Sequence, residues 1–384
     1  MKPIKVLIIE QNILARQAIA GTLRKHAPFK VTGVFGNVGQ VEKKVRDSSP
    51  DVILLDIESN EGLRILEGLK TDFPRCPVVV LSRRTPEGAE LALSALEAGA
   101  LDFITKPRLG QNLLFASRHF TKRLIPIIQM SARLKGENRE SGHKKAQLIE
   151  DPEEVGVSGK DMKARKPKVL VIGACTGGPT ALTELVSALP ENFDIPIVVV
   201  QHFPKYYTAE LAEVLNRRSK LTVREAGEGA LLQAGMVWIA PGGFHCEISG
   251  WSCKPFLKVH RGPRELDVRP SINNLFRSAA NIFGRDVLAV LLSGHGEDGF
   301  EGIKSVKRAG GTVIVQHPDS AQVPELPLKA LNSGLADYKF FPEKIAELVN
   351  EIYDTGFPEA TEKKATLKGG IVSHKVSLEN LTNY

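Results

Sequence analysis

Short apolar runs alternate with longer amphipathic stretches over roughly the first 120 residues of the chain. These runs cover residues 4–9, 31–34, 52–56, 78–82 and 101–104. Strands separated by helical patterns of this length predict a fivefold βα repeat, in which helices cover both faces of a parallel sheet. The carboxyl ends of parallel strands meet at one edge, where functional side chains gather. The candidates at this edge are Glu10, Asp56, Ser82 and Lys106.

A second pattern of this kind runs from residue 169 to about residue 353. Its strand-like runs cover residues 169–172, 197–200, 237–239, 287–292 and 312–315. Between the two patterns, residues 135–168 are charged, poor in apolar residues and without a steady period, which is typical of a linker. We therefore predict a first domain at 1–124, a charged linker at 125–167, a second domain at 168–354 and a flexible tail at 355–384.

Composition is consistent with two globular domains, since 42% of the 384 residues are hydrophobic and 25% are charged. No apolar run approaches the roughly 20 residues that span a bilayer, and the N-terminus has no signal-peptide cleavage pattern. We expect a cytoplasmic protein without membrane insertion. The net charge of +7 comes without a basic stripe interleaved with aromatic residues, and no helix-turn-helix pattern is present. Nucleic acid is therefore not an expected partner.

Three of the predicted strands in the first domain end in residues suited to phosphoryl transfer. Asp56 ends one strand, Ser82 ends the next, and Lys106 precedes Pro107 after the last. An aspartate accepts a phosphoryl group when a divalent metal screens the incoming charge and a hydroxyl and a lysine hold the transferred oxygens. Read singly, Asp56 and Lys106 are equally consistent with a strand cap and a surface ion pair, so the joint spacing carries the prediction.

Together these residues resemble the response-regulator receiver family, which has a flavodoxin-like (βα)5 fold. The resemblance implies that Asp56 is the phosphorylation site, that Ser82 is the switch hydroxyl and that Lys106 is the cation that holds the transferred oxygens. It also implies Mg²⁺ as a cofactor, held by Glu10 and Asp56. The family has two adjacent acids after its first strand, whereas this chain has Glu10 and Gln11, an amide.

A strand, a glycine-rich turn and a helical pattern follow one another at the start of the second domain. The turn reads Gly173-Ala-Cys175-Thr-Gly-Gly178. Small residues permit a sharp turn that exposes the side chain at its apex, while the N–H groups of the following helix face that point. A thiol at position 175 would therefore have a lowered pKa, and an oxyanion would find donors nearby. The alternative for Cys175 is a small, inert core residue.

This turn resembles the Gly-Ala-Ser-Thr-Gly-Gly motif of the chemotaxis protein-glutamate methylesterase/protein-glutamine glutaminase family, with Cys175 replacing the nucleophilic serine. Further matching segments contain His202 and Asp298, and lie around residues 239–243 and 269–276. The resemblance implies a doubly wound, mainly parallel α/β esterase domain with a Cys175–His202–Asp298 triad. It implies hydrolysis of glutamate methyl esters, or deamidation of glutamines, without a cofactor.

The same resemblance implies that the partners are methyl-accepting chemoreceptors and a histidine kinase of the chemotaxis type. Thr176 and His295 would lie beside the oxyanion. His295 stands where the family has a methionine whose backbone N–H helps to bind the oxyanion, and Glu297 stands where asparagine is common, so we expect additional negative charge beside Asp298. A non-catalytic binding regulator that retains the receptor and kinase contacts remains the alternative. Cys76, Cys246 and Cys253 are interpreted as structural or surface residues.

Overall fold

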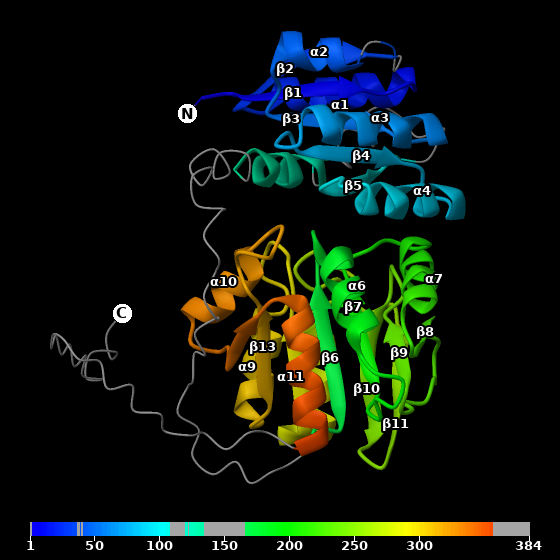
Figure 1. Cartoon of the computed structure of the whole chain (residues 1–384), viewed down its shortest axis with the longest axis vertical. Coiled ribbons are helices and arrows are strands. Elements are labelled where there is room, and N and C mark those ends of the chain that lie inside the picture. The colour runs from blue at the N-terminus through cyan, green and yellow to red at the C-terminus, as the bar shows by residue number, and fades with distance from the viewer. Residues whose placement is uncertain are drawn as a thin grey trace, which may run out of the picture.

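A computed structural model describes residues 2–36, 39, 41–107, 120–121, 123–133 and 166–355. Two α/β units lie one on the other, with the N-terminal unit across one end of the C-terminal unit (Figure 1). Most of the predicted linker and nearly all of the predicted tail lie outside the described residues. Among the helices that are described, none is long and apolar enough to cross a membrane.

The N-terminal unit is a five-stranded parallel sheet in the order β2-β1-β3-β4-β5. β3 and β4 are buried at every residue because helices cover both faces of the sheet. The elements are β1 (Ile4–Ile9), α1 (Ile13–Lys25), β2 (Phe29–Phe35), α2 (Val41–Ser48), β3 (Val52–Asp56), α3 (Asn60–Asp72), β4 (Val78–Ser82), α4 (Pro86–Glu97) and β5 (Asp102–Thr105). The strand order reverses between β1 and β3, which places Glu10 and Asp56 side by side at the carboxyl edge.

The core of this unit extends further along the chain than predicted. Residues 120–121 and 123–133 are helical, and Phe120, Leu124 and Ile128 are fully buried against β1 and β3. The predicted domain end at residue 124 lies within this helix, which packs on the sheet. The apolar residues of this helix have the helical spacing of a core-facing stripe, and this spacing distinguishes them from the charged linker that follows.

The C-terminal unit is a seven-stranded parallel sheet in the order β14-β13-β12-β6-β7-β9-β8. Its elements are β6 (Val169–Ala174), α6 (Gly178–Ala188), β7 (Ile197–Gln201), α7 (Tyr207–Arg218), β8 (Thr222–Glu225), β9 (Met236–Ile239), β10 (His245–Trp251), β11 (Lys254–His260), α8 (Ile272–Phe283), β12 (Val287–Leu291), α9 (Phe300–Arg308), β13 (Thr312–Gln316), α10 (Glu325–Asn332), β14 (Tyr338–Phe340) and α11 (Pro342–Thr355). The strand order reverses at β6, so the carboxyl end of β6 is a topological switch point.

The predicted α/β fold of both units is confirmed, and each predicted strand is present with its ends shifted by at most two residues. β8, β14 and the antiparallel hairpin β10–β11 were not predicted. They lack the continuous apolar run that marks a buried strand. In β8, for example, only Val223 is buried.

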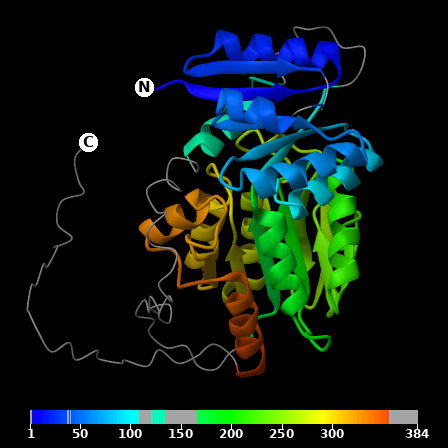
Figure 2. The ribbon, with the colours of Figure 1, turned by 45° about the horizontal axis from the view of Figure 1, so that its top comes forward.

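Aromatic side chains join the two units. Phe103 of β5 stacks on Tyr207 of α7 with the ring centroids 4.3 Å apart, and Phe203 contacts Phe103 edge-on at 4.9 Å. These residues belong to one apolar cluster that continues from the first unit into the second. The rotated view shows α4 of the first unit lying over the end of the second unit where α7 begins (Figure 2). The junction is therefore a packed interface.

Candidate active site and receiver site

Cys175 lies in the sharp turn between β6 and α6, as the glycine pattern predicted. Gly177 has a φ of +76°, and a Cβ there would lie 2.5 Å from the Ser293 hydroxyl. A Cβ on Gly178 would lie 2.3 Å from the Gln201 amide oxygen. Only glycine allows the chain to turn this tightly at these two positions. The thiol thus lies at the carboxyl end of the central strand, next to the N-terminus of α6.

His202 and Asp298 meet beside this turn. His202 directly follows β7, and its Nε2 lies 2.7 Å from Asp298 Oδ2. Asp298 is itself held by the N-terminus of α8, since the backbone N–H groups of Ile272 and Asn273 donate to its carboxylate at 2.6 and 3.0 Å. These donors orient the carboxylate so that it fixes the imidazole, which leaves the other ring nitrogen of His202 for the thiol.

The charges of this cluster favour a thiolate. Burial alone would raise the pKa of the Cys175 thiol, but His295 and His202 hold it well below its usual value. Burial alone would lower the pKa of His202, but Cys175 and Asp298 raise it to about 10. Burial likewise opposes ionisation of Asp298, yet its hydrogen bond with His202 keeps the pKa of this carboxyl below its ordinary value. A thiolate beside a protonated imidazole is the reactive form of a catalytic cysteine.

The side chain of His295 is a second imidazole at the thiol. Its Nδ1 lies 3.8 Å from Cys175 Sγ and 3.2 Å from Thr176 Oγ1. The negative charge of Cys175 raises the pKa of His295 to about 9, against the effect of burial. Sequence reasoning considered only the backbone of His295, because the direction of this side chain depends on how the loop after β12 packs against the turn.

Glu297 does not add charge to the site as predicted. Its carboxylate is exposed and pairs with Lys329 at 2.6 Å, and this pairing lowers its own pKa. Side chains of successive residues in this loop point to different sides, so the Glu297 carboxylate faces solvent while that of Asp298 is buried.

The N-terminal unit covers the thiol. Thr176 Oγ1, next to Cys175, donates to Asp102 Oδ2 of β5 at 2.6 Å. Tyr207 Oη lies 3.1 Å from Ser82 Oγ and 2.8 Å from the carbonyl oxygen of Arg83. Cys175 is only 7% exposed in this arrangement. A protein substrate therefore cannot reach the thiol until the two units separate.

The carboxyl edge of the N-terminal sheet holds a compact charged cluster. Lys106 Nζ lies 2.9 Å from Glu10 Oε1, and 2.7 Å from both Asp56 Oδ1 and Glu58 Oε1. Burial raises the pKa of Glu10 to about 7, although Lys106 opposes the shift. The Ser82 hydroxyl donates to the Gly88 carbonyl at 2.5 Å. Glu10, Asp56 and Lys106 thus come together, and Glu58 joins them unpredicted. The Ser82 hydroxyl instead contacts the Gly88 carbonyl and Tyr207.

Comparisons with known proteins identify both units. The CheB methylesterase family matches residues 170–349, and the response regulator receiver domain family matches residues 6–117. The protein-glutamate methylesterase/protein-glutamine glutaminase of Trichodesmium erythraeum is 33% identical over 356 residues, covering 90% of this chain and 98% of the relative. The enzyme of the same name from Thermotoga maritima is 35% identical over 353 residues, covering 90% of this chain and 98% of the relative. The chain belongs to the protein-glutamate methylesterase/protein-glutamine glutaminase family.

Solved structures were compared with the chain as well. The Thermotoga maritima CheB methylesterase catalytic domain is 39% identical and covers 49% of this chain and 100% of its own, with a TM-score of 0.48. The family resemblance predicted from Cys175, His202 and Asp298 is confirmed. The catalytic roles of these residues, and the phosphorylation of Asp56, stay predictions.

In this chain, two carboxylates of the N-terminal unit could serve as oxygen ligands of Mg²⁺. Glu10 Oε2 is buried and has no hydrogen-bond partner among the described residues, and the Asp56 carboxylate lies beside Glu10. Mg²⁺ is commonly bound through one or two carboxylates and several waters. No group of three or more His, Cys, Asp or Glu side chains suited to a metal occurs within the described ranges. The fit therefore depends on these two carboxylates.

Two residues that join the receiver to the catalytic unit over Cys175 were not predicted from the sequence. Asp102 reads as an ordinary first residue of a strand, and Tyr207 as the start of an amphipathic helix. Tyr207 is fully buried although it carries a hydroxyl, which is a signal that a polar partner exists. Its partner lies 125 positions away in the other unit. No local pattern could have identified it.

Proposed function

We propose that this chain is a receiver-controlled protein-glutamate methylesterase and glutaminase whose nucleophile is the Cys175 thiolate. The supporting observation is the convergence of three side chains from three strand ends. Cys175 lies beside His202, whose imidazole is 2.7 Å from Asp298. The lowered pKa of the thiol supports a catalytic cysteine over an inert core residue.

In the proposed reaction the Cys175 sulfur attacks the γ-carbonyl carbon of a glutamyl methyl ester and forms a C–S bond. The carbonyl oxygen becomes an oxyanion at the N-terminus of α6, where backbone N–H groups stabilise it. Collapse breaks the C–O bond, and His202 gives its proton to the departing methanol. Water then loses a proton to His202 and attacks the thioester, which releases glutamate and the thiolate. A glutamine substrate would release ammonia.

His295 has a distinct part in this proposal. Serine needs a base at the moment of attack, whereas a cysteine beside two imidazoles is already ionised at rest. The Nδ1 of His295, 3.8 Å from the sulfur, would stabilise the thiolate while His202 handles the transferred protons. The replacement of serine by cysteine and of methionine by histidine would then be one coupled change.

Control by phosphorylation of Asp56 completes the proposal. Mg²⁺, held by Glu10 and Asp56, would screen the charge of the incoming phosphoryl group. Ser82 would turn toward the phosphorylated Asp56 and leave Tyr207, which weakens the interface over Cys175. The phosphate donor would be a chemotaxis-type histidine kinase, and the substrates would be methyl-accepting chemoreceptors. The reaction would take place in the cytosol.

The test is hydrolysis of a methyl-esterified chemoreceptor by the full chain, activated with a small phosphodonor and Mg²⁺. Wild type is compared with Cys175→Ala, Cys175→Ser and the control Cys253→Ser, whose thiol is exposed on the β10–β11 turn. We expect methanol release by wild type and by the control, and none by Cys175→Ala. Turnover by Cys175→Ala would refute the proposed nucleophile. A silent wild type with an active Cys175→Ser would instead support a binding regulator.

A further inference from the structure

The loop between β11 and α8, residues 261–268, is held in an unusual backbone conformation. Leu266 and Asp267 are successive non-glycine residues with φ of 49° and 63°. Glu265 and Val268 close the turn through reciprocal backbone hydrogen bonds of 3.3 and 2.9 Å. A left-handed conformation is costly for leucine because its Cβ crowds the backbone, and such strain persists where it serves a function.

The leucine in this turn faces solvent. Leu266 is 54% exposed, although the two units are closed over the thiol. Glycine or asparagine would adopt the same turn with less strain, and a polar residue would be better solvated. A leucine at this position therefore costs both backbone strain and solvation. An exposed apolar side chain on a rigid loop is typical of an anchor for a binding partner.

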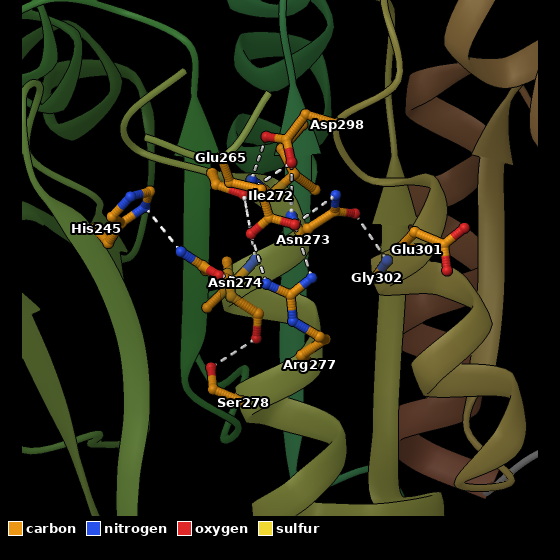
Figure 3. A network of polar contacts seen from close by, with 12 residues as sticks. His245, Glu265, Ile272, Asn273, Asn274, Arg277, Ser278, Asp298, Glu301 and Gly302 are labelled. Atoms are coloured by element: carbon orange, nitrogen blue, oxygen red, sulfur yellow. Dashed lines mark hydrogen bonds and ion pairs between the residues drawn. The ribbon is translucent and has the colours of Figure 1, made fainter. Parts of the chain in front are cut away.

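The loop is rigidly connected to the catalytic carboxylate. Arg277 and Asn273 both donate hydrogen bonds to the carboxylate of Glu265, the residue before Leu266 (Figure 3). Asn273 also donates its backbone N–H to Asp298 at 3.0 Å. Because the first residues of α8 contact both Glu265 and Asp298, the turn has a fixed position relative to the triad.

Arginines flank the exposed leucine. Arg261 and Arg264 are exposed. Burial lowers the pKa of Arg269, and the nearby charges of Arg264 and Arg261 lower it further. Arg264 donates to the carbonyl oxygen of Asp267 at 3.0 Å, and Arg261 lies over the Phe244 ring at 4.7 Å. Within the described part of the chain, none of the three forms an ion pair with a carboxylate. The loop also has two acids, Glu265, which pairs with Arg277, and Asp267, so the arginines are the groups available to an acidic partner.

The loop lies beside the catalytic carboxylate. Arg264 and Cys175 both act on the charge of Arg123, which lies in the helical residues 123–133 of the receiver. Ser271 Oγ donates to Asp298 Oδ1 at 2.8 Å and lies 3.4 Å from Oε2 of Glu265, the residue before Leu266, so a substrate bound at the triad lies close to this loop. The substrate of the proposed function is a protein segment bearing glutamates, whose carboxylates complement these guanidinium groups.

We infer that residues 261–268 form the docking element for the substrate protein. Leu266 contacts an apolar side chain on the receptor segment, and Arg261 and Arg264 pair with acidic residues that flank the modified glutamate. The inference rests on the proposed function for the identity of the substrate. Docking itself does not require turnover, and this makes the two separately testable.

The binding experiment uses full chains that carry Cys175→Ala, so that no substrate is consumed. Affinity for the cytoplasmic fragment of a methyl-esterified chemoreceptor is measured by fluorescence anisotropy for Leu266→Gly and Arg264→Gln. Each should weaken binding about tenfold, the effect of losing one buried apolar or charged contact. Arg264→Gln should also reduce the salt dependence of binding. The matched controls are Trp251→Gly at the end of β10 and Arg308→Gln at the end of α9, both at exposed positions.

Turnover in the otherwise unmodified chain separates docking from catalysis. We expect Leu266→Gly to lower kcat/KM for the receptor about tenfold, while turnover of a small N-acylated glutamate γ-methyl ester stays within about twofold of wild type. Leu266→Gly should also unfold at an equal or higher temperature, since it relieves strain. Unchanged receptor affinity, or equal losses on both substrates, would overturn the inference. A wild type inactive on both substrates would refute the proposed function, and the binding result would still decide the docking role.

Discussion

Replacing Tyr207 by Phe tests whether the interface between the receiver and the catalytic unit restrains activity. The substitution keeps the ring that stacks on Phe103 at 4.3 Å and removes only the hydroxyl. That hydroxyl lies 3.1 Å from Ser82 Oγ and 2.8 Å from the Arg83 carbonyl oxygen. Burial raises the pKa of Tyr207 to about 12, so the group is a hydrogen-bond donor at all relevant pH values.

The expected magnitude follows from one hydrogen bond. A phenol has a single proton, so the two contacts amount to one donated bond shared between two acceptors. A buried hydrogen bond contributes about 0.5–1.5 kcal/mol net to the closed arrangement. The ratio of closed to open molecules should therefore fall by about two- to thirteenfold. Ring packing is unchanged, so the free energy of unfolding of each unit should change little.

The assay is hydrolysis of methyl-esterified chemoreceptor by the full chain without a phosphodonor. If the closed arrangement dominates at rest, basal turnover of Tyr207→Phe should rise by this factor, while fully activated turnover stays unchanged. Tyr206→Phe is the matched control, because the Tyr206 ring lies under Lys205 and its hydroxyl forms no hydrogen bond with the described residues of the receiver. Equal basal rates for Tyr207→Phe and wild type would refute the idea that this interface restrains the enzyme.

Three further predictions concern pH and packing. Burial raises the pKa of Cys175 and the charge of His295 lowers it, so His295→Met should raise this pKa. Alkylation of Cys175 by iodoacetamide in the activated chain should then require a pH about one unit higher, and an unchanged pH profile would exclude a role of His295 in stabilising the thiolate. Burial in the closed arrangement raises the pKa of Asp102 from 3.8 to about 6. Because the closed arrangement favours the protonated carboxyl, its stability relative to the open one is greatest below pH 3.8 and falls as the pH rises through 6. Asp102→Asn should therefore abolish that pH dependence of basal turnover, and its persistence would place the titrating group elsewhere. Gly173→Ala would place a Cβ 2.4 Å from a buried isoleucine and should cost about 1–3 kcal/mol in urea unfolding, whereas Gly227→Ala, with no atom within 4 Å, should be nearly neutral.

Much of the fold could be predicted because a parallel strand covered by helices on both faces must be apolar throughout. β3, β4 and β6 are buried at every residue and were predicted with nearly their observed ends. The strands that were missed, such as β8 and the β10–β11 hairpin, have an exposed face and carry polar residues there. Residues 125–133 were assigned to the linker, because an apolar stripe indicates that one face of a helix is buried but does not say which element lies opposite.

The sequence by itself determined which residues end the central strands of the two sheets. Strand direction and strand order then oblige Glu10 to meet Asp56, and Cys175 to meet His202, because parallel strands bring their carboxyl ends to one edge. The glycines after Cys175 likewise determined the turn, since a Cβ at Gly177 or Gly178 would overlap a neighbouring side chain.

Only the tertiary structure decided what surrounds the thiol. The His295 side chain approaches Cys175 across 120 positions of sequence, and Thr176 meets Asp102 across 74. Such contacts depend on how one unit is rotated on the other and on how loops pack, and local hydrophobic patterns do not encode either. Periodicity reports which face of an element is buried, whereas the identity of the opposing side chain is set by the packing of the whole molecule.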